Sequence, residues 1–202
     1  MKKPKSEDKV YVDYCIIGTG NIAIKHLDNV KKMSKSSQVV VIKRSSVKTN
    51  KIKTDNIVNL KNNLAYVNPK SKSSIAIICS PATYHIKDAI ICAKRGFNLF
   101  IEKPLTIELR DFKKLAKIIL DKNLKIFVGY NMRFFEKHKY LKKIIVDKRY
   151  GSVLDIRINV ETNFERWRKN KNYTLSVTSK KELGGGVINE LSHETDYMYD
   201  LF

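Results

Sequence analysis

The segment Val10–Ala23, VYVDYCIIGTGNIA, is the most informative part of the sequence. Its first half ends in the apolar run Cys15-Ile16-Ile17 and stops at Gly18, which is typical of a central parallel strand covered on both faces. The residues after the glycines favour a helix with one buried side, because apolar residues recur at helical spacing. These residues are Ile22, Ala23, Leu27 and Val30. The segment therefore predicts a strand, a tight turn and a helix in succession.

The turn carries the pattern G-x-G-x-x-A, in which each small residue has a physical role. The first glycine permits the tight turn, the second lets a pyrophosphate approach the backbone, and the alanine lets helix and strand pack closely. The N-terminus of the helix then offers free N–H groups to the phosphates. The pattern predicts a dinucleotide site formed by Gly18, Thr19, Gly20, Asn21 and Ile22. A glycine turn without a ligand is the alternative.

The rest of the first 130 residues alternates short apolar runs with helical patterns. Helices are expected over His85–Lys94, with Gly96 directly after the helix, and after Thr106 as the N-cap. Residues 44–73 give no clear element. Further strands are expected at Gln38–Ile42, Ser74–Cys79, Asn98–Ile101 and Lys125–Val128. Alternating strands and helices predict an α/β domain over residues 1–130, a Rossmann doubly wound parallel sheet.

A different pattern begins near residue 131 and predicts a second domain over residues 131–202. A basic helix comes first, and Ser152–Glu161 then alternates apolar and polar residues. Period two is typical of a half-buried strand in an antiparallel sheet. We therefore expect an α+β domain with a mainly antiparallel sheet. Its single clear strand needs a partner from residues 163–180 or from another chain, so we expect this domain to be incomplete.

Composition argues for a globular protein with no membrane segment. The chain of 202 residues is 43% hydrophobic, and its formal net charge is +20. Its lysines are scattered and no nucleic-acid-binding or metal-binding motif is evident, so nucleic-acid binding is disfavoured and no metal site is expected. No run approaches about 20 apolar residues, and the N-terminus is charged. The cysteines Cys15, Cys79 and Cys92 lie in apolar runs and suit reduced, buried thiols in the cytoplasm.

The end of the second expected strand bears on the choice of cofactor. A site for NAD usually has an acidic residue there, which binds the ribose hydroxyls. This chain has Lys43-Arg44-Ser45 instead. Arg44 and Ser45 suit a 2′-phosphate, so NADP is preferred over NAD as the expected cofactor. A solvated, lysine-rich loop is the alternative.

Two further segments resemble a known family. One comprises Cys79–His85 and Phe100–Thr106, with Glu102-Lys103-Pro104 after a strand, and the other is Leu183–Asp196. Together with the glycine turn they resemble the Gfo/Idh/MocA family, the glucose-fructose oxidoreductase and inositol 2-dehydrogenase group, from about Tyr11 to Phe202. The resemblance implies an NAD(P)-dependent oxidoreductase of a sugar, amino sugar or nucleotide-linked sugar. Members are usually longer and form dimers or tetramers, so it also implies a C-terminally truncated chain.

The resemblance implies two catalytic residues, Lys103 and His193. The ammonium of Lys103 would lie beside the nicotinamide and favour the alkoxide of the substrate, while the imidazole of His193 would accept the hydroxyl proton. Asn189 occupies the position, four residues before His193, where the family often has aspartate. On one continuous helix, Asn189 and Asp196 would both neighbour the imidazole, and Glu190 is a second candidate partner.

The remaining expected contacts follow from the same resemblance. On the cofactor side they are Ser80, Pro81, His85 and Glu102, beside Lys103. On the substrate side they are Asn131, Arg133, Trp167, Arg168, Asn189, Glu190 and His193. Trp167 could stack on a sugar ring and Arg168 could bind a carboxylate or phosphate, but a plain loop anchor explains them equally well. A truncated, inactive dinucleotide-binding protein is the alternative function.

Overall fold

A computed structural model of the chain describes residues 9–43, 52, 58–61, 63–161, 163 and 176–202. The chain divides into two compact units, Met1–Val128 and Gly129–Phe202. Within the described part of the chain, no helix combines the length and the apolar composition that crossing a bilayer requires.

The first unit is built on a six-stranded, fully parallel sheet with the order β4-β3-β2-β6-β7-β8. The chain moves outward from β2 through β3 to β4, and then restarts beside β2 at β6. This is the strand order of a dinucleotide-binding Rossmann sheet, so the predicted doubly wound fold is confirmed. The strands are β2 (Tyr14–Ile17), β3 (Val39–Ile42), β4 (Val58–Lys61), β6 (Ile75–Ile78), β7 (Asn98–Ile101) and β8 (Ile126–Val128).

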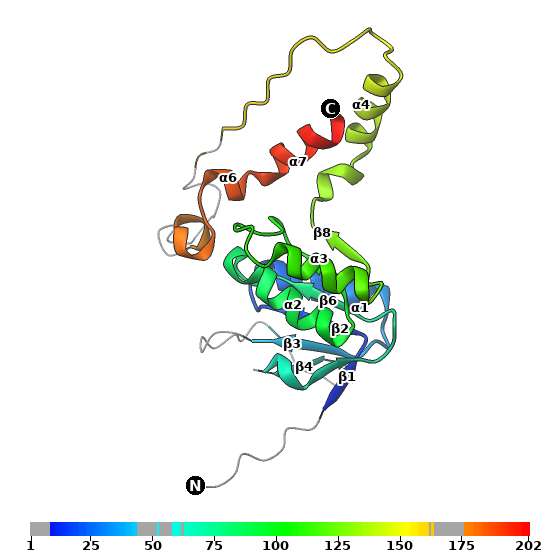
Figure 1. Cartoon of the computed structure of the whole chain (residues 1–202), viewed down its shortest axis with the longest axis vertical. Helices are drawn as coiled ribbons and strands as arrows, with labels where there is room; N and C mark the ends of the chain where they lie inside the picture. The colour runs from blue at the N-terminus through cyan, green and yellow to red at the C-terminus, as the bar shows by residue number, and fades with distance from the viewer. Residues whose placement is uncertain (1–8, 44–51, 53–57, 62, 162, 164–175) are drawn as a thin grey trace. The chain divides into compact units, whose positions relative to one another are not determined.

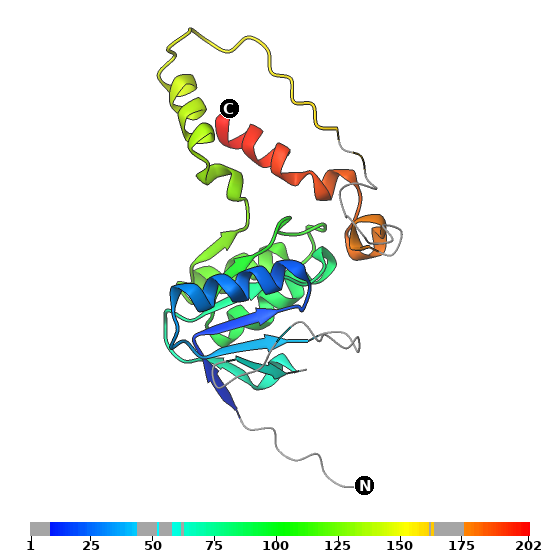
Figure 2. The same ribbon diagram turned by 180° about the vertical axis from the view of Figure 1, so that it is seen from behind.

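Helices cover both faces of this sheet. Helix α1 (Asn21–Met33) lies on one face, whereas α2 (His85–Arg95) and α3 (Phe112–Asp121) lie on the other (Figures 1 and 2). Each face has its own apolar cluster, because successive side chains of a strand point to opposite faces. Ala23, Leu27 and Val30 of α1 complete one cluster, and Ile86, Ala89 and Ala93 of α2 belong to the other. The three cysteines are buried, as predicted, and form no disulfide bond.

The predicted strand over Val10–Ile17 is divided in the structure. β1 (Val10–Val12) leaves the main sheet and pairs in parallel with β5 (Val67–Pro69). Asp13 causes the break, because its carboxylate accepts the N–H of Gln38 at 2.9 Å and its own N–H donates to the Gln38 carbonyl at 3.0 Å. The segment that the sequence left unassigned contains β4, β5 and the 3₁₀ helix η1 (Leu64–Tyr66).

Helix α3 begins later than the sequence predicts. Thr106 does not cap it: the Thr106 hydroxyl donates to the Glu108 carbonyl at 2.6 Å and accepts the Glu108 N–H at 3.1 Å. Such local bonds between a threonine side chain and the backbone compete with helix formation. The helix therefore starts at Phe112, after Asp111 in a left-handed conformation with φ of 61°.

The regular elements described in the second unit are helices. A 3₁₀ turn and α4 (Glu136–Val146) come first, and α6 (Val187–Glu190) and α7 (Ser192–Leu201) come last. The predicted strand Ser152–Glu161 is wrong, because this segment is extended but pairs with no other described segment (Figure 1). Leu154 is 97% exposed, so the apolar side of the alternation is not buried. The 3₁₀ turns are η3 (Asn131–Phe134), η5 (Val177–Ser179) and η6 (Lys181–Leu183).

Candidate functional site

The glycine turn lies where the strand order of the sheet reverses. β2 and β6 are neighbours whose following connections lead in opposite directions, and ligands of such sheets bind outside the carboxyl ends of these two strands. Gly18 follows β2 with φ of +116°, and a Cβ there would lie 2.7 Å from the Cys79 carbonyl oxygen. Only glycine lets the two strand ends approach this closely.

Gly20 is a glycine for a different reason. Its φ of −76° suits any residue, and a Cβ on Gly20 would meet no atom within 4 Å. Packing within the first unit therefore does not require a glycine at this exposed position. In dinucleotide sites, the glycine at this place in the pattern leaves room for a ligand against the backbone.

The N-terminus of α1 is open to an anion. Gly20 is the N-cap and contributes no side-chain hydrogen bond, and no acidic residue lies in the first turn of this fully described helix. The first N–H groups of a helix need acceptors from outside it, and the helix dipole favours a negative group there. The residues Gly18–Ala23 thus fit the pyrophosphate of a dinucleotide.

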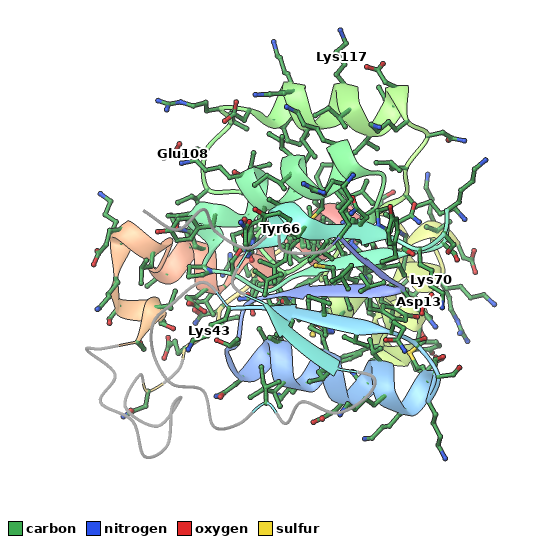
Figure 3. All side chains as sticks on the ribbon, turned by 90° about the horizontal axis from the view of Figure 1, so that it is seen from below. Asp13, Lys43, Tyr66, Lys70, Glu108 and Lys117 are labelled. Carbon is green, nitrogen blue, oxygen red and sulfur yellow. The ribbon has the colours of Figure 1, made fainter. Side chains whose placement is uncertain are left out.

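The end of β3 contributes positive charge to the same edge of the sheet. Lys43 follows β3 directly and lies at the opposite end of the sheet from Asp13 and Lys70 (Figure 3). Asp13 and Lys70 form an ion pair at 3.4 Å. Arg44 and Ser45, which the sequence assigns to a 2′-phosphate, lie outside the described residues.

Lys103 follows β7 in the loop of the E-K-P motif. The N–H of Glu102 donates to the Ile78 carbonyl at 2.9 Å, so the loop starts in register with β6. Lys103 itself is half-buried, and its peptide bond to Pro104 is cis. The Glu102 carboxylate accepts a hydrogen bond from His26 Nε2 of α1 at 2.7 Å. The lysine therefore stands at the carboxyl edge of the sheet, in the same unit as the glycine turn.

Two residues expected on the cofactor side are held inside the protein instead. His85 is 2% exposed, with Nδ1 2.7 Å from the Pro104 carbonyl and Nε2 2.8 Å from the Ser80 carbonyl. Burial lowers the pKa of His85, while the two carbonyl acceptors oppose that change by stabilising the protonated ring. The Ser80 hydroxyl donates to buried Asp88 at 2.7 Å. His85 and Ser80 thus help to hold the loops after β6 and β7 in place, and Pro81 of the first loop is half-buried. Their contact with a cofactor stays a prediction.

Arg133, expected to bind substrate, is part of an ion-pair cluster within the second unit. It donates to Asp196 from Nε at 2.8 Å and Nη2 at 2.6 Å, and to Asp200 from Nη1 at 3.1 Å. His138 and Lys142 of α4 also bind Asp200, at 2.8 and 2.9 Å, and these bonds lower the pKa of Asp200 to about 2. Arg133 therefore joins η3 to α7, whereas Asn131 of the same turn is exposed. For both residues, contact with a substrate stays a prediction.

The helix that the sequence predicts through Asn189 and His193 is interrupted. The chain leaves the helical conformation at Leu191, so α6 and α7 are separate helices and Asn189 does not share a face with His193. The Asn189 amide instead donates to the carbonyls of Gly184 and Gly185, at 3.1 and 3.4 Å. His193 is half-buried, and the Tyr130 ring meets it edge-on at 5.9 Å between centroids.

Asn189 and Glu190 do line a cavity in the second unit. Its volume is about 870 Å³, and Gly185 and Gly186 of the loop before α6 also line it. Across the described residues, no three histidine, cysteine, aspartate or glutamate side chains gather as a metal site would require.

The profile of a family described as "Oxidoreductase family, NAD-binding Rossmann fold" (Gfo/Idh/MocA) matches residues 12–130 of this sequence. This is more than half of the chain. The chain belongs to the Gfo/Idh/MocA oxidoreductase family. The resemblance drawn from the E-K-P motif and the glycine turn is thereby confirmed.

Relatives of this Gfo/Idh/MocA chain are considerably longer. The chain is 25% identical over 186 residues to a 2,7-anhydro-N-acetylneuraminate hydratase of Mediterraneibacter gnavus, covering 92% of this chain and 48% of that protein. It is 25% identical over 152 residues to a myo-inositol 2-dehydrogenase of Thermotoga maritima, covering 71% and 43%. The chain thus spans about half the length of the curated relatives it matches.

A solved structure of the WlbA dehydrogenase from Chromobacterium violaceum, in complex with NADH and UDP-GlcNAcA, has a similar fold. The TM-score is 0.54 at 19% identity, and the match covers 75% of this chain and 44% of that one. At this identity the likeness concerns the fold alone. It agrees with the Rossmann strand order of the first unit.

Sequence reasoning missed one residue of the first unit that bears on the site. His26 of the Gfo/Idh/MocA chain binds the glutamate of the E-K-P motif, although the two are 76 residues apart. A signal was present, because His26 follows buried Ala23 by three positions and therefore lies on the side of α1 that meets the sheet. Trp167 and Arg168, expected on the substrate side, lie outside the described residues.

Proposed function

We propose that this chain binds a nicotinamide dinucleotide at Gly18–Ala23 and serves an oxidoreductase that acts on a CH–OH group of a sugar, amino sugar or nucleotide-linked sugar. The open position of Gly20 before an uncapped helix carries the proposal. Neither feature stabilises the fold, and both suit a bound pyrophosphate.

The substrate class is supported by what the relatives are called. The names of the two relatives contain a cyclitol, myo-inositol, and an anhydro sugar acid. The similar structure holds a uridine-linked sugar. All are ring compounds with several oxygen substituents, which suits a lysine that acts on one hydroxyl oxygen.

The chemistry divides between the cofactor and this chain. A bound nicotinamide ring supplies a carbon that accepts or donates hydride. The Lys103 ammonium stabilises negative charge on the substrate oxygen as the carbon is oxidised, because a fixed positive group in a partly buried site favours the alkoxide. The His193 imidazole serves as the proton acceptor of the second unit.

We further propose that NADP(H) is bound more tightly than NAD(H). Lys43-Arg44-Ser45 puts cationic and hydroxyl groups after β3, where an acidic residue would repel a 2′-phosphate. Arg44→Ala should weaken NADPH binding roughly 10-fold or more and leave NADH binding unchanged, since a hydrogen bond to a charged group contributes about 1.5–3 kcal/mol. Tighter binding of NADH by the wild-type chain would refute this preference.

The resemblance also supports a homo-oligomer in the cytoplasm. Light scattering of the purified protein and cell fractionation test these two proposals.

Calorimetric titration with NADH and NADPH tests the binding step, and Gly20→Ala is the matching variant. We expect saturable binding by the wild-type chain and at least roughly 10-fold weaker binding by Gly20→Ala, which corresponds to about 1.4 kcal/mol of lost contact. A panel of sugars and cyclitols with the bound dinucleotide then tests turnover. Binding without turnover over the whole panel would select the inactive alternative.

A further inference from the structure

The loop that carries Lys103 is contacted by histidines on both sides of the lysine. His26 binds the residue before it, and His85 binds the residue after it. The catalytic proposal uses neither histidine, and both lie entirely within the first unit.

His26 reaches the loop from the face of the sheet that α1 covers. Its Nε2 lies 2.7 Å from Glu102 Oε1, and both side chains are largely buried, at 19% and 16% exposure. The ring packs edge-on against Phe100 of β7, with 5.0 Å between centroids and 64° between planes. The second Glu102 oxygen accepts the N–H of Lys103 at 3.3 Å. His26 thereby orients a carboxylate that is itself bonded to the backbone of the lysine.

His85 reaches the loop from the opposite face, where it begins α2. Its two ring nitrogens bridge the carbonyls of Pro104 and Ser80, at 2.7 and 2.8 Å. A carbonyl can only accept a hydrogen bond, so both contacts are hydrogen bonds when both ring nitrogens carry a proton, and in that form the ring ties the lysine loop to the end of β6. The end of β6 also packs against Gly18, which connects the lysine loop to the glycine turn.

We propose that His26 and His85 are positioning residues that fix the backbone of residues 102–104 from opposite faces of the sheet and thereby aim Lys103. The inference rests on the proposed function of Lys103. Two anchors on either side of one residue restrict both the place and the direction of its side chain, and a misplacement of about 1 Å costs roughly 100-fold in rate.

The test compares His26→Leu with His26→Gln in the full chain. Glutamine carries an amide nitrogen near the place of Nε2 and can keep the bond to Glu102, whereas leucine cannot. The rate at which sulfosuccinimidyl acetate acylates Lys103 is followed by peptide mass spectrometry, with and without saturating NADH or NADPH. Lys94 and Lys117 of α2 and α3 are internal references, and dinucleotide affinity is measured in parallel.

We expect the acylation rate of Lys103 in the dinucleotide-free protein to rise roughly 10-fold in His26→Leu. The loop then loses one hydrogen bond to a charged group, and the free energy of such a bond corresponds to a factor of about this size. His26→Gln should stay near the wild-type rate, and Lys94 and Lys117 should not change. Bound dinucleotide should slow acylation of Lys103 in the wild-type chain and in His26→Gln. In His26→Leu it should bind with similar affinity but give less of this protection.

Equal Lys103 rates in all three proteins would overturn the positioning role and leave the proposed function intact. If the wild-type chain bound no dinucleotide, the proposed function would fail whatever the acylation rates. Should His26→Leu not fold, His26→Asn replaces it, because asparagine is polar but too short to reach Glu102. His85→Phe and His85→Gln test the second anchor in the same way, because phenylalanine removes the hydrogen bonds of the ring and glutamine can keep one of them. Acylation of Lys103 should rise in His85→Phe more than in His85→Gln. A wild-type rate in His85→Phe would contradict the role of His85.

Discussion

Around Gly20 in the first unit there is open space beside an uncapped helix, whereas in the second unit Arg133 and Asn189 donate hydrogen bonds to neighbouring groups of the protein. Both sets of residues were expected to bind ligands. The difference teaches that an unexplained glycine or an open helix end points to a ligand more strongly than a polar side chain near a cleft does. A polar side chain can serve the fold equally well, and only the structure reveals which.

The largest effect is expected at Lys103, where the first unit contributes directly to chemistry. Lys103→Met should reduce kcat by about 10²–10³, as losing one preorganised electrostatic group commonly does. Dinucleotide affinity should stay within a few-fold, and exposed Lys94→Met is the control. Wild-type turnover by Lys103→Met, measured on an active sugar from the panel, would remove this residue from the mechanism.

The two glycines of the turn should separate folding from binding. Gly18→Ala should lower the free energy of unfolding by about 2–4 kcal/mol, because a Cβ would collide with the Cys79 carbonyl and φ is positive. Gly20→Ala should leave that free energy unchanged or raise it by up to about 1 kcal/mol, since alanine restricts the unfolded chain. Urea denaturation of the full chain gives both values. Equal losses in the two variants would contradict the distinction between a structural and a ligand-facing glycine.

In the second unit, Arg133 should behave as a structural residue. Arg133→Met should destabilise this unit by about 1–3 kcal/mol, because Asp196, whose side chain is 8% exposed, loses a bidentate partner. Arg157 forms an ion pair with Asp155 on the surface, and their side chains are 89% and 67% exposed, respectively. Arg157→Met should therefore change the free energy of unfolding by at most about 0.5 kcal/mol. Hydrogen exchange of the α7 amides measures both. If the α7 amides of Arg133→Met lost no protection from exchange, the structural role of Arg133 would be contradicted.

A smaller effect is expected from acid. The folded pKa of Asp200 is about 2, below its ordinary value of 3.8, because His138 and Lys142 bind the carboxylate. A depressed pKa stabilises the folded state above about pH 4, and this contribution is lost as the pH falls from about 4 towards 2. Protection of α7 should decline over that window in the wild-type chain and depend less on pH in Asp200→Asn. An identical pH profile in both would show that this carboxylate does not couple to the stability of α7.

The sequence predicted the first unit well where a single local rule governs the residues. The strand, glycine turn and helix of residues 14–33 follow from apolar spacing and from the needs of a tight turn, and Gly96 ends α2 with φ of 95° as expected. Errors arose where partners lie far apart in the chain. Asp13 breaks a strand because it binds Gln38, and Arg133 binds Asp196 across 63 positions.

Two other differences have local causes that periodicity does not reveal. The helix break at Leu191 separates Asn189 from His193, and the Asn189 side chain binds the loop before it rather than the next turn. Apolar and polar residues alternate in Ser152–Glu161, and this pattern is compatible with a strand that has one buried face. A strand forms only when a neighbouring strand supplies hydrogen bonds, and the pattern does not show whether one is present. His26 escaped notice because a histidine on the buried side of a helix has no characteristic motif.

The most direct test of the account is a titration of the ¹⁵N-labelled full chain with NADH and with NADPH, followed by amide chemical shifts. We expect the amides of Asn21, Ile22 and Ala23 to shift on saturation, because they begin α1 at the phosphate position. Gly20→Ala should require higher dinucleotide concentrations for the same shifts. Saturable binding that left these three amides unmoved, or no binding at all by the folded chain, would contradict the central claim.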